Sequence, residues 1–160
     1  MKKIVALTLL LCVSPVLAYV DGADDLHISI SLTEGEHSRD SNSTSTAISI
    51  NGSKLVYDKS YSGYRANKRT PVHKEIKIKA DDMKRLKKVI AKEKLLISRR
   101  LEHPSNGPGR YSIGTISLAL GKKRASIKVS GTISEIENEP LYKNVRALME
   151  EIQRIVEAYQ

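Results

Sequence analysis

Apolar and polar residues alternate along several segments of the chain. In residues 26–32 every second residue is Leu or Ile, with His or Ser between them, which is typical of a β-strand with one buried face. Residues 46–50 and 72–78 show the same period of two. Asn51 and Gly52 lie between residues 46–50 and another apolar run, and this dipeptide favours a tight turn because both residues tolerate positive φ. The pattern therefore predicts a β-hairpin.

Two further alternating runs, at residues 111–120 and 125–129, flank a turn at residues 121–123 and predict a second hairpin. The segments between the apolar runs are polar and rich in turn-forming residues. We therefore expect loops or connectors at residues 33–45, 61–71, 103–109 and 130–139.

Two segments have the residue spacing of an amphipathic helix. Asp81 and Asp82 are suited to a helix N-terminus, and apolar residues follow at helical spacing as far as Ile90. We expect this helix to end near Lys94, with residues 95–97 packing as the chain turns away. Pro140 is suited to the first turn of a second helix. Six residues recur there at steps of three and four: Leu141, Val145, Leu148, Ile152, Ile155 and Tyr159.

Together these elements predict an α+β fold. The expected architecture is a mostly antiparallel sheet of five to six strands with two helices packed on one face, since no repeated strand–helix–strand order demands a parallel sheet. Residues 19–160 have the length of a single domain.

The first 18 residues have the pattern of a secretory signal peptide. Lys2 and Lys3 precede an apolar run at residues 4–13, and Val16 and Ala18 suit cleavage before Tyr19. The run is shorter than the ~20 residues that cross a bilayer as a helix, so we expect no transmembrane segment in the mature chain. The sequence thus predicts an exported protein, located in the periplasm or outside the cell.

Residue types in the mature chain exclude several kinds of chemistry. Cys12, the single cysteine, lies in the predicted signal, so neither a disulfide nor a thiolate site is expected afterwards. An exported protein without disulfides suggests a bacterial envelope. The histidines lack zinc-binding spacing, and no nucleophile or phosphate-loop motif is present. We therefore predict no cofactor, no metal site and no catalytic residue.

Positive charge is concentrated in the middle of the chain. Residues 65–100 contain fourteen Lys or Arg residues and four acids, within a chain that has 27 Lys or Arg and 18 Asp or Glu. On the first predicted helix the cations cover the side away from the core: Lys84, Arg85, Lys87, Lys88 and Lys92. This side is either an ordinary solvated helix face or a face for an anionic partner, such as an acidic protein, lipid headgroups or an anionic envelope component. The predicted export disfavours nucleic acid as the partner.

Tyrosines lie beside cations in the predicted loop at residues 61–71. Tyr61 and Tyr64 precede Arg65, Lys68 and Arg69. Aromatic rings among cations can stack on sugars, bases or a partner's side chains, although ordinary loop residues would give the same pattern. These five residues and the five helix cations are the predicted binding residues.

From Ala80 onward the layout resembles that of small exported inhibitor domains, such as the emfourin family of metalloprotease inhibitors. The shared features are a helix at residues 83–94, the Leu95-Leu96-Ile97 exit, a hairpin at residues 111–129 and Pro140 at the start of the last helix. Leu and Ile stand where that family has aromatic residues after the first helix, so no inhibitory site is carried over.

Three hypotheses for function follow. The first is a non-enzymatic binding protein, such as an inhibitor or immunity protein, with a basic face for an acidic partner. The second is an enzyme acting on cell-envelope polymers, whose acid–base groups would share one pocket and come from His27, His73, Glu135 and Glu137. The third is a peripheral membrane-surface protein. The first hypothesis requires that the middle cations gather on one surface after folding.

Overall fold

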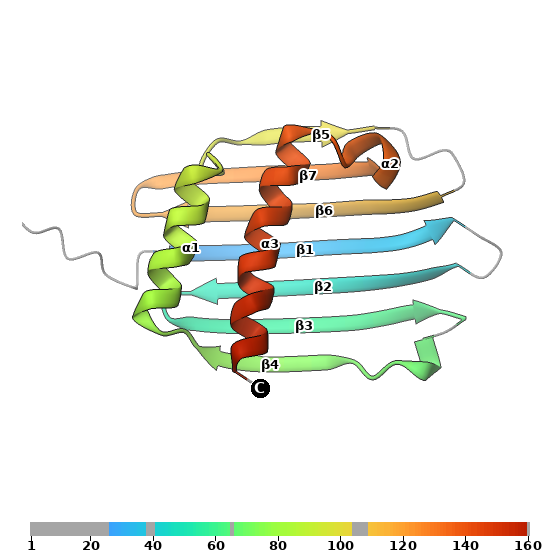
Figure 1. Ribbon diagram of the computed structural model, residues 1–160, viewed down its shortest axis with the longest axis horizontal. Helices are drawn as coiled ribbons and strands as arrows, with labels where there is room; N and C mark the ends of the chain where they lie inside the picture. The colour runs from blue at the N-terminus through green and yellow to red at the C-terminus, as the bar shows by residue number, and fades with distance from the viewer. Residues whose placement is uncertain (1–25, 38–40, 65, 104–108, 160) are drawn as a thin grey trace, which may run out of the picture.

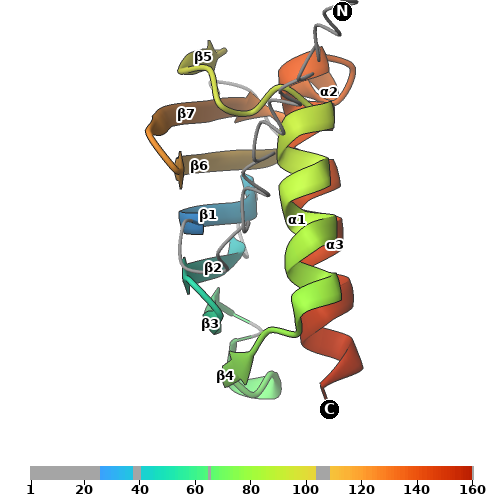
Figure 2. The ribbon, with the colours of Figure 1, turned by 90° about the vertical axis from the view of Figure 1, so that its left-hand side faces the viewer.

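Seven strands form one mixed sheet, and two long helices pack against one of its faces (Figure 1, Figure 2). This computed structural model describes residues 26–37, 41–64, 66–103 and 109–159, so the predicted signal peptide lies outside the described residues. The order across the sheet is β4-β3-β2-β1-β6-β7-β5. The strands are β1 (Leu26–His37), β2 (Asn42–Asn51), β3 (Lys54–Gly63), β4 (Val72–Lys77), β5 (Arg99–Glu102), β6 (Gly109–Leu120) and β7 (Lys123–Thr132).

The alternation in the sequence places the apolar residues of the central strands on one face. Ile30 of β1 lies opposite Ile48 of β2 and Ile116 of β6, and Ile116 lies opposite Ile127 of β7. All four side chains are buried. A row of β-branched residues therefore crosses the sheet on the helix side, while the intervening residues face the uncovered side.

Both predicted hairpins are confirmed, with Gly52 and Gly121 at positive φ in their turns. The loops expected around them are partly wrong, because β1, β2, β3 and β7 all extend into those polar segments. Polar residues interrupt the apolar alternation in these segments, but the backbone hydrogen bonds between the strands continue. Thr33 and Ser45, for example, lie opposite each other with their hydroxyl oxygens 3.1 Å apart. The expected connector at residues 130–139 also contains a short helix, α2 (Ile133–Ile136).

The sheet has seven strands instead of the expected five to six, because the sequence pattern did not predict β5. This strand pairs with β7 in parallel, which makes the sheet mixed. Its sequence offers Leu101 as the only apolar residue, so no alternation marks it as a strand. An edge strand of this length needs few apolar contacts, because the backbone ladder to β7 holds it in place. β4 and β5 are the two edges of the sheet.

The two long helices, α1 (Ala80–Lys92) and α3 (Pro140–Ala158), lie side by side across the strands, as predicted (Figure 1, Figure 2). Leu86, Ile90, Leu148 and Ile152 are fully buried between the helices and the sheet. Asn144 of α3 donates a hydrogen bond to the Glu93 carbonyl, 3.0 Å away, at the end of α1. In the described part of the chain, no helix is both long and apolar enough to cross a membrane.

The C-terminus of α1 lies two residues before the expected position. Lys94 adopts a φ of 53°, and its N–H and that of Leu95 return to the carbonyls of Ala91 and Ile90. This double return is a Schellman motif, in which a residue in the left-handed region ends the helix. Leu95 is buried as expected for the exit from the helix, but Ile97 is 52% exposed.

Asp82, which is itself buried, joins the two helices through a group of charges whose arginines are partly exposed. Its carboxylate accepts hydrogen bonds from Arg85 of α1 and from Arg154 and Tyr159 of the α3 end, with 2.9 Å to Arg154 Nη2 and 3.2 Å to Tyr159 Oη. Burial alone would raise the pKa of Asp82, but the hydrogen bonds from Arg154, Arg85 and Tyr159 outweigh it and hold this pKa below its ordinary value. The ionised carboxylate is therefore part of the helix–helix contact.

Asp82→Asn should lower the free energy of unfolding by about 2 kcal/mol at pH 7, because it removes the buried negative charge that Arg85 and Arg154 contact and leaves them Glu151 alone. The folded pKa lies below the unfolded one, so the contribution of Asp82 is complete at neutral pH and is lost as pH falls through the folded pKa. In urea titrations the difference between wild type and variant should therefore shrink below about pH 4.

The matched control is Asp81→Asn, because Asp81 is the exposed neighbour of Asp82 on the same helix turn. It should change stability by less than about 0.5 kcal/mol. Equal stability of the Asp82→Asn variant and the wild type at pH 7 would show that the charge group does not hold the helices together.

Candidate functional site

The predicted binding residues fall into two groups at opposite ends of the strands. The five helix cations are on α1, which crosses one end of the sheet (Figure 1). The tyrosine and arginine group is at the far end of β3 and around the short 3₁₀ helix η2 (Ala66–Lys68), beyond α3. The predicted binding residues therefore do not form one continuous surface, and the gathering that the first hypothesis requires is not met by the two groups together. A basic face has to be sought within the helix group alone.

On α1 the cations differ in how far their charge is compensated. Arg85 pairs with Asp82 and lies 3.6 Å from a Glu151 carboxylate oxygen, so its charge belongs to the helix–helix contact. Lys92 Nζ lies 3.5 Å from Glu93. Lys84 and Lys88 are exposed and have no acidic partner among the residues that the structure describes.

Lys84, Lys88 and Lys92 follow one another at intervals of four residues, which places them along one side of the helix. All three are exposed, whereas Lys87 is only partly exposed. We call these three residues the lysine row. At 1.5 Å per residue, the row extends about 12 Å along the helix axis.

At the other end of the sheet, Tyr61 lies between two cations. The Arg69 guanidinium is 5.3 Å and Lys59 Nζ is 5.9 Å from the centre of the Tyr61 ring. Both distances are within the range of a cation–π interaction. The predicted association of tyrosine and cations is thus present at Tyr61 and Arg69. Lys68 is exposed, Tyr64 is 77% exposed, and Arg65 lies outside the described residues.

The strands continue past α3, and this leaves part of the helix-side face uncovered (Figure 1). There the row of paired residues across the sheet is Tyr61, Thr44, Glu34 and Ser112, in place of the isoleucines beneath the helices. The surface between these strands and α3 is hollow. We call it the α3 groove, and the charged residues that line it include Glu34, Glu36, Lys59, Arg69, Arg110 and Arg146.

Glu34 lies at the centre of the α3 groove. Its carboxylate is 3.5 Å from Arg146 Nη1 of α3, and it lines each of the three hollows that make up the groove. Tyr142 is buried beside it. Burial, and then the charge of Glu34, raise the pKa of Tyr142, so this phenol in the first turn of α3 stays protonated.

Sequence reasoning missed five of these six charged residues in the groove: Glu34, Glu36, Lys59, Arg110 and Arg146. Glu34 and Glu36 lie two and four residues after the buried Leu32, so a longer strand would place them on the same face. Thr44 and Thr46 are β-branched residues, which favour strands. Those two signals could have identified strands in the segment that was expected to be a loop. Arg110 and Arg146 come from β6 and α3, and only the fold brings them to Glu34.

The uncovered face of the sheet is polar and has small side chains at its centre. Ser49, Ser29, Ser117 and Ser126 lie opposite one another across four strands, and His27 lines a shallow hollow beside the first three of them. Glu137 lines the α3 groove on the other side of the sheet. These two residues, which the enzyme hypothesis groups together, therefore face opposite sides.

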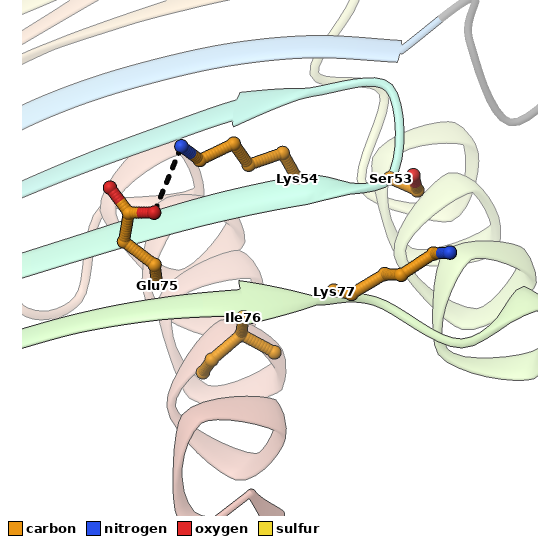
Figure 3. A pocket seen from close by; sticks show the side chains of 5 residues that line it. All are labelled: Ser53, Lys54, Glu75, Ile76 and Lys77. Atoms are coloured by element: carbon orange, nitrogen blue, oxygen red, sulfur yellow. Dashed lines mark ion pairs between the residues drawn. The ribbon is translucent and has the colours of Figure 1, made fainter.

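At the β4 edge, Lys54 Nζ lies 3.0 Å from Glu75, and both side chains are on the uncovered face (Figure 3). Ile76 points from the same strand to the helix side. Ser53 and Lys77 complete this hollow. Because its two central charges neutralise each other, this hollow offers little to a charged ligand.

His73 pairs with Asp58 on the same face, with 2.5 Å between Nδ1 and the carboxylate oxygen. The hydrogen bond to Asp58, and then its negative charge, raise the pKa of His73 above the ordinary value. In the described part of the chain, no group of three His, Cys, Asp or Glu side chains is placed to hold a metal ion.

Asp58→Asn should lower the pKa of His73, because it removes the negative charge that favours the imidazolium. The contribution of this pair to stability is present at low pH and is lost as pH rises through the folded pKa of His73. Two-dimensional NMR of the imidazole protons during a pH titration measures the shift. Asp81→Asn, which is distant on α1, is the control, and an unchanged His73 titration in the Asp58→Asn variant would contradict the assignment.

No protein-family model matches the chain, and no curated protein sequence is significantly similar to it. The resemblance to emfourins therefore stays one of element order and spacing.

Proposed function

We propose that the protein is an exported, non-enzymatic binding protein that docks onto an acidic protein through the lysine row. The observation that carries this proposal is that Lys84, Lys88 and Lys92 are exposed along one side of α1, and Lys84 and Lys88 have no acidic partner among the described residues. An acidic partner would supply the missing counter-charges.

The fold does not need this arrangement of charge. Like charges four residues apart destabilise a helix by about 0.2–0.5 kcal/mol per pair. Arg85, on the neighbouring side, shows how the same helix compensates a cation when the charge serves packing, because Asp82 and Glu151 face it. Lys84 and Lys88 oppose helix stability and pair with no acidic residue in the described part of the chain, and binding to a partner best explains them.

A second basic segment lies at the same end of the molecule as α1 and supports docking there. Lys122, Lys123 and Arg124 are exposed in and after the β6–β7 turn. That turn lies at the end of the sheet that α1 crosses (Figure 1). Clustered cations raise the local potential and speed the association with an acidic partner.

Replacing both Lys84 and Lys88 with Glu should weaken binding to the partner at least tenfold, because two attractive contacts become repulsive. Residues 19–160 would be used to capture proteins from an envelope extract, and the captured acidic protein would be purified and titrated by calorimetry at several salt concentrations. The affinity of the wild type should fall with salt, and that of the variant should depend on salt far less.

The matched control is Lys128→Glu combined with Lys77→Glu, which makes the same change of charge on the uncovered face of the sheet. This control should bind much more tightly than the α1 variant. If both variants lost the same affinity for the partner, the loss would come from the change in net charge alone, and docking through α1 would be refuted. Binding to anionic phospholipid vesicles that the α1 variant alone loses, without any acidic protein partner, would favour the membrane-surface hypothesis instead.

A further inference from the structure

We propose that the α3 groove is a second binding site, independent of the lysine row, and that its ligand is an acidic oligosaccharide. The site brings three cations from separate segments together with an aromatic ring and with five glutamates that line the groove, Glu34, Glu36, Glu137, Glu150 and Glu157. Lys59 comes from β3, Arg69 from the segment after η2, and Arg110 from β6. Nothing in the local sequence of any one of them predicts this convergence.

The groove has the size and shape of a ligand site. Three adjoining hollows of about 360, 410 and 340 Å³ share Glu34, so they form one elongated depression between α3 and the projecting strands. Each is within the range of about 300–1,000 Å³ that is typical of small-molecule sites. An elongated ligand with several units fits this shape better than a single small ion.

Lys59, Arg69 and Arg110 are available to bind an anionic group. Arg69 and Lys59 both lie over the Tyr61 ring, which fixes their positions without neutralising them. Arg110 lies opposite Glu36 in the β1–β6 pairing. Among the described residues, no ion pair within 4 Å neutralises Lys59, Arg69 or Arg110. An arginine fork is well suited to a ligand carboxylate or sulfate.

The carboxylates decide which class of anion fits. Glu34 and Glu36 would repel a ligand that offers only negative charge, such as phosphate or an acidic peptide segment. A sugar unit that carries a carboxylate also carries hydroxyl groups, which can donate hydrogen bonds to Glu34 and Glu36 while its carboxylate accepts from the arginines. Arg146 holds Glu34 in place from the α3 side.

The part of the groove next to α3 is lined by apolar residues as well as by charged ones such as Glu150 and Glu157. Leu32, Tyr57 and Met149 line it together with the polar Gln153, which accepts a hydrogen bond from the Tyr57 hydroxyl at 3.1 Å. Leu32 and Tyr57 are buried, so Met149, which is partly buried, supplies the apolar contact for the C–H face of a sugar ring. A site that combines cations with carboxylates thus matches an acidic saccharide, whose hydroxyl groups can donate hydrogen bonds, more closely than an acidic peptide.

The test titrates residues 19–160 with tetragalacturonate, a tetrasaccharide of uronic acids, and with maltotetraose as its neutral counterpart. Calorimetry should give saturable binding of the uronate, with maltotetraose at least tenfold weaker. Arg69→Ala combined with Arg110→Ala should raise the Kd for the uronate at least tenfold. Circular dichroism and thermal unfolding establish that each variant is folded.

The matched control is Lys84→Ala combined with Lys88→Ala, which removes the same number of charges from α1. It should leave uronate binding within twofold of the wild type, so failure at the groove and failure at the lysine row remain distinguishable. The proposal is overturned by an absence of uronate binding, by equal losses in the two double variants, by equal binding of maltotetraose, or by tighter binding of a tetraglutamate peptide with the same dependence on Arg69 and Arg110.

Discussion

The strands are longer than the helix layer that covers them, and the rest of the molecule follows from this mismatch. A strand of 12 residues such as β1 spans roughly 40 Å, whereas two helices side by side cover only about 20 Å of it. Apolar side chains are needed only under the helices. Beyond α3 the same face therefore carries Glu34, Thr44 and Tyr61, and the α3 groove is the space that the helices leave uncovered.

The parts of the fold that bury apolar surface could be predicted from the sequence. Residues 26–32 and the apolar steps after Pro140 identified β1 and α3, because a period of two or of three and four is what burial on one face requires. The extension of β1 to His37 and the edge strand β5 could not be predicted in the same way. Both are held mainly by backbone hydrogen bonds, which any residue except proline can make.

The charged residues were predicted as a segment of the chain, but their surroundings come from the tertiary structure. Arg85 and Lys88 are alike in the sequence, yet Arg85 is neutralised by Asp82 and Glu151 whereas Lys88 has no acidic partner among the described residues. Asp82 stands three residues before Arg85 on the same helix, and α3 adds Glu151 from more than fifty residues later in the chain. Tyr61 and Arg69 were identified from their proximity in the sequence, whereas Arg110 required the pairing of β1 with β6.

The two edges of the sheet also determine how the protein behaves towards other extended chains. A free edge strand offers unpaired backbone groups that can recruit another strand and begin fibril growth. Here β4 carries His73, Glu75 and Lys77 at alternate positions, and the four-residue β5 includes Arg100 and Glu102. An incoming apolar strand would have to desolvate these charges, so each edge opposes addition. These charges disfavour polymerisation at both edges, neither of which is covered by a helix of the described residues.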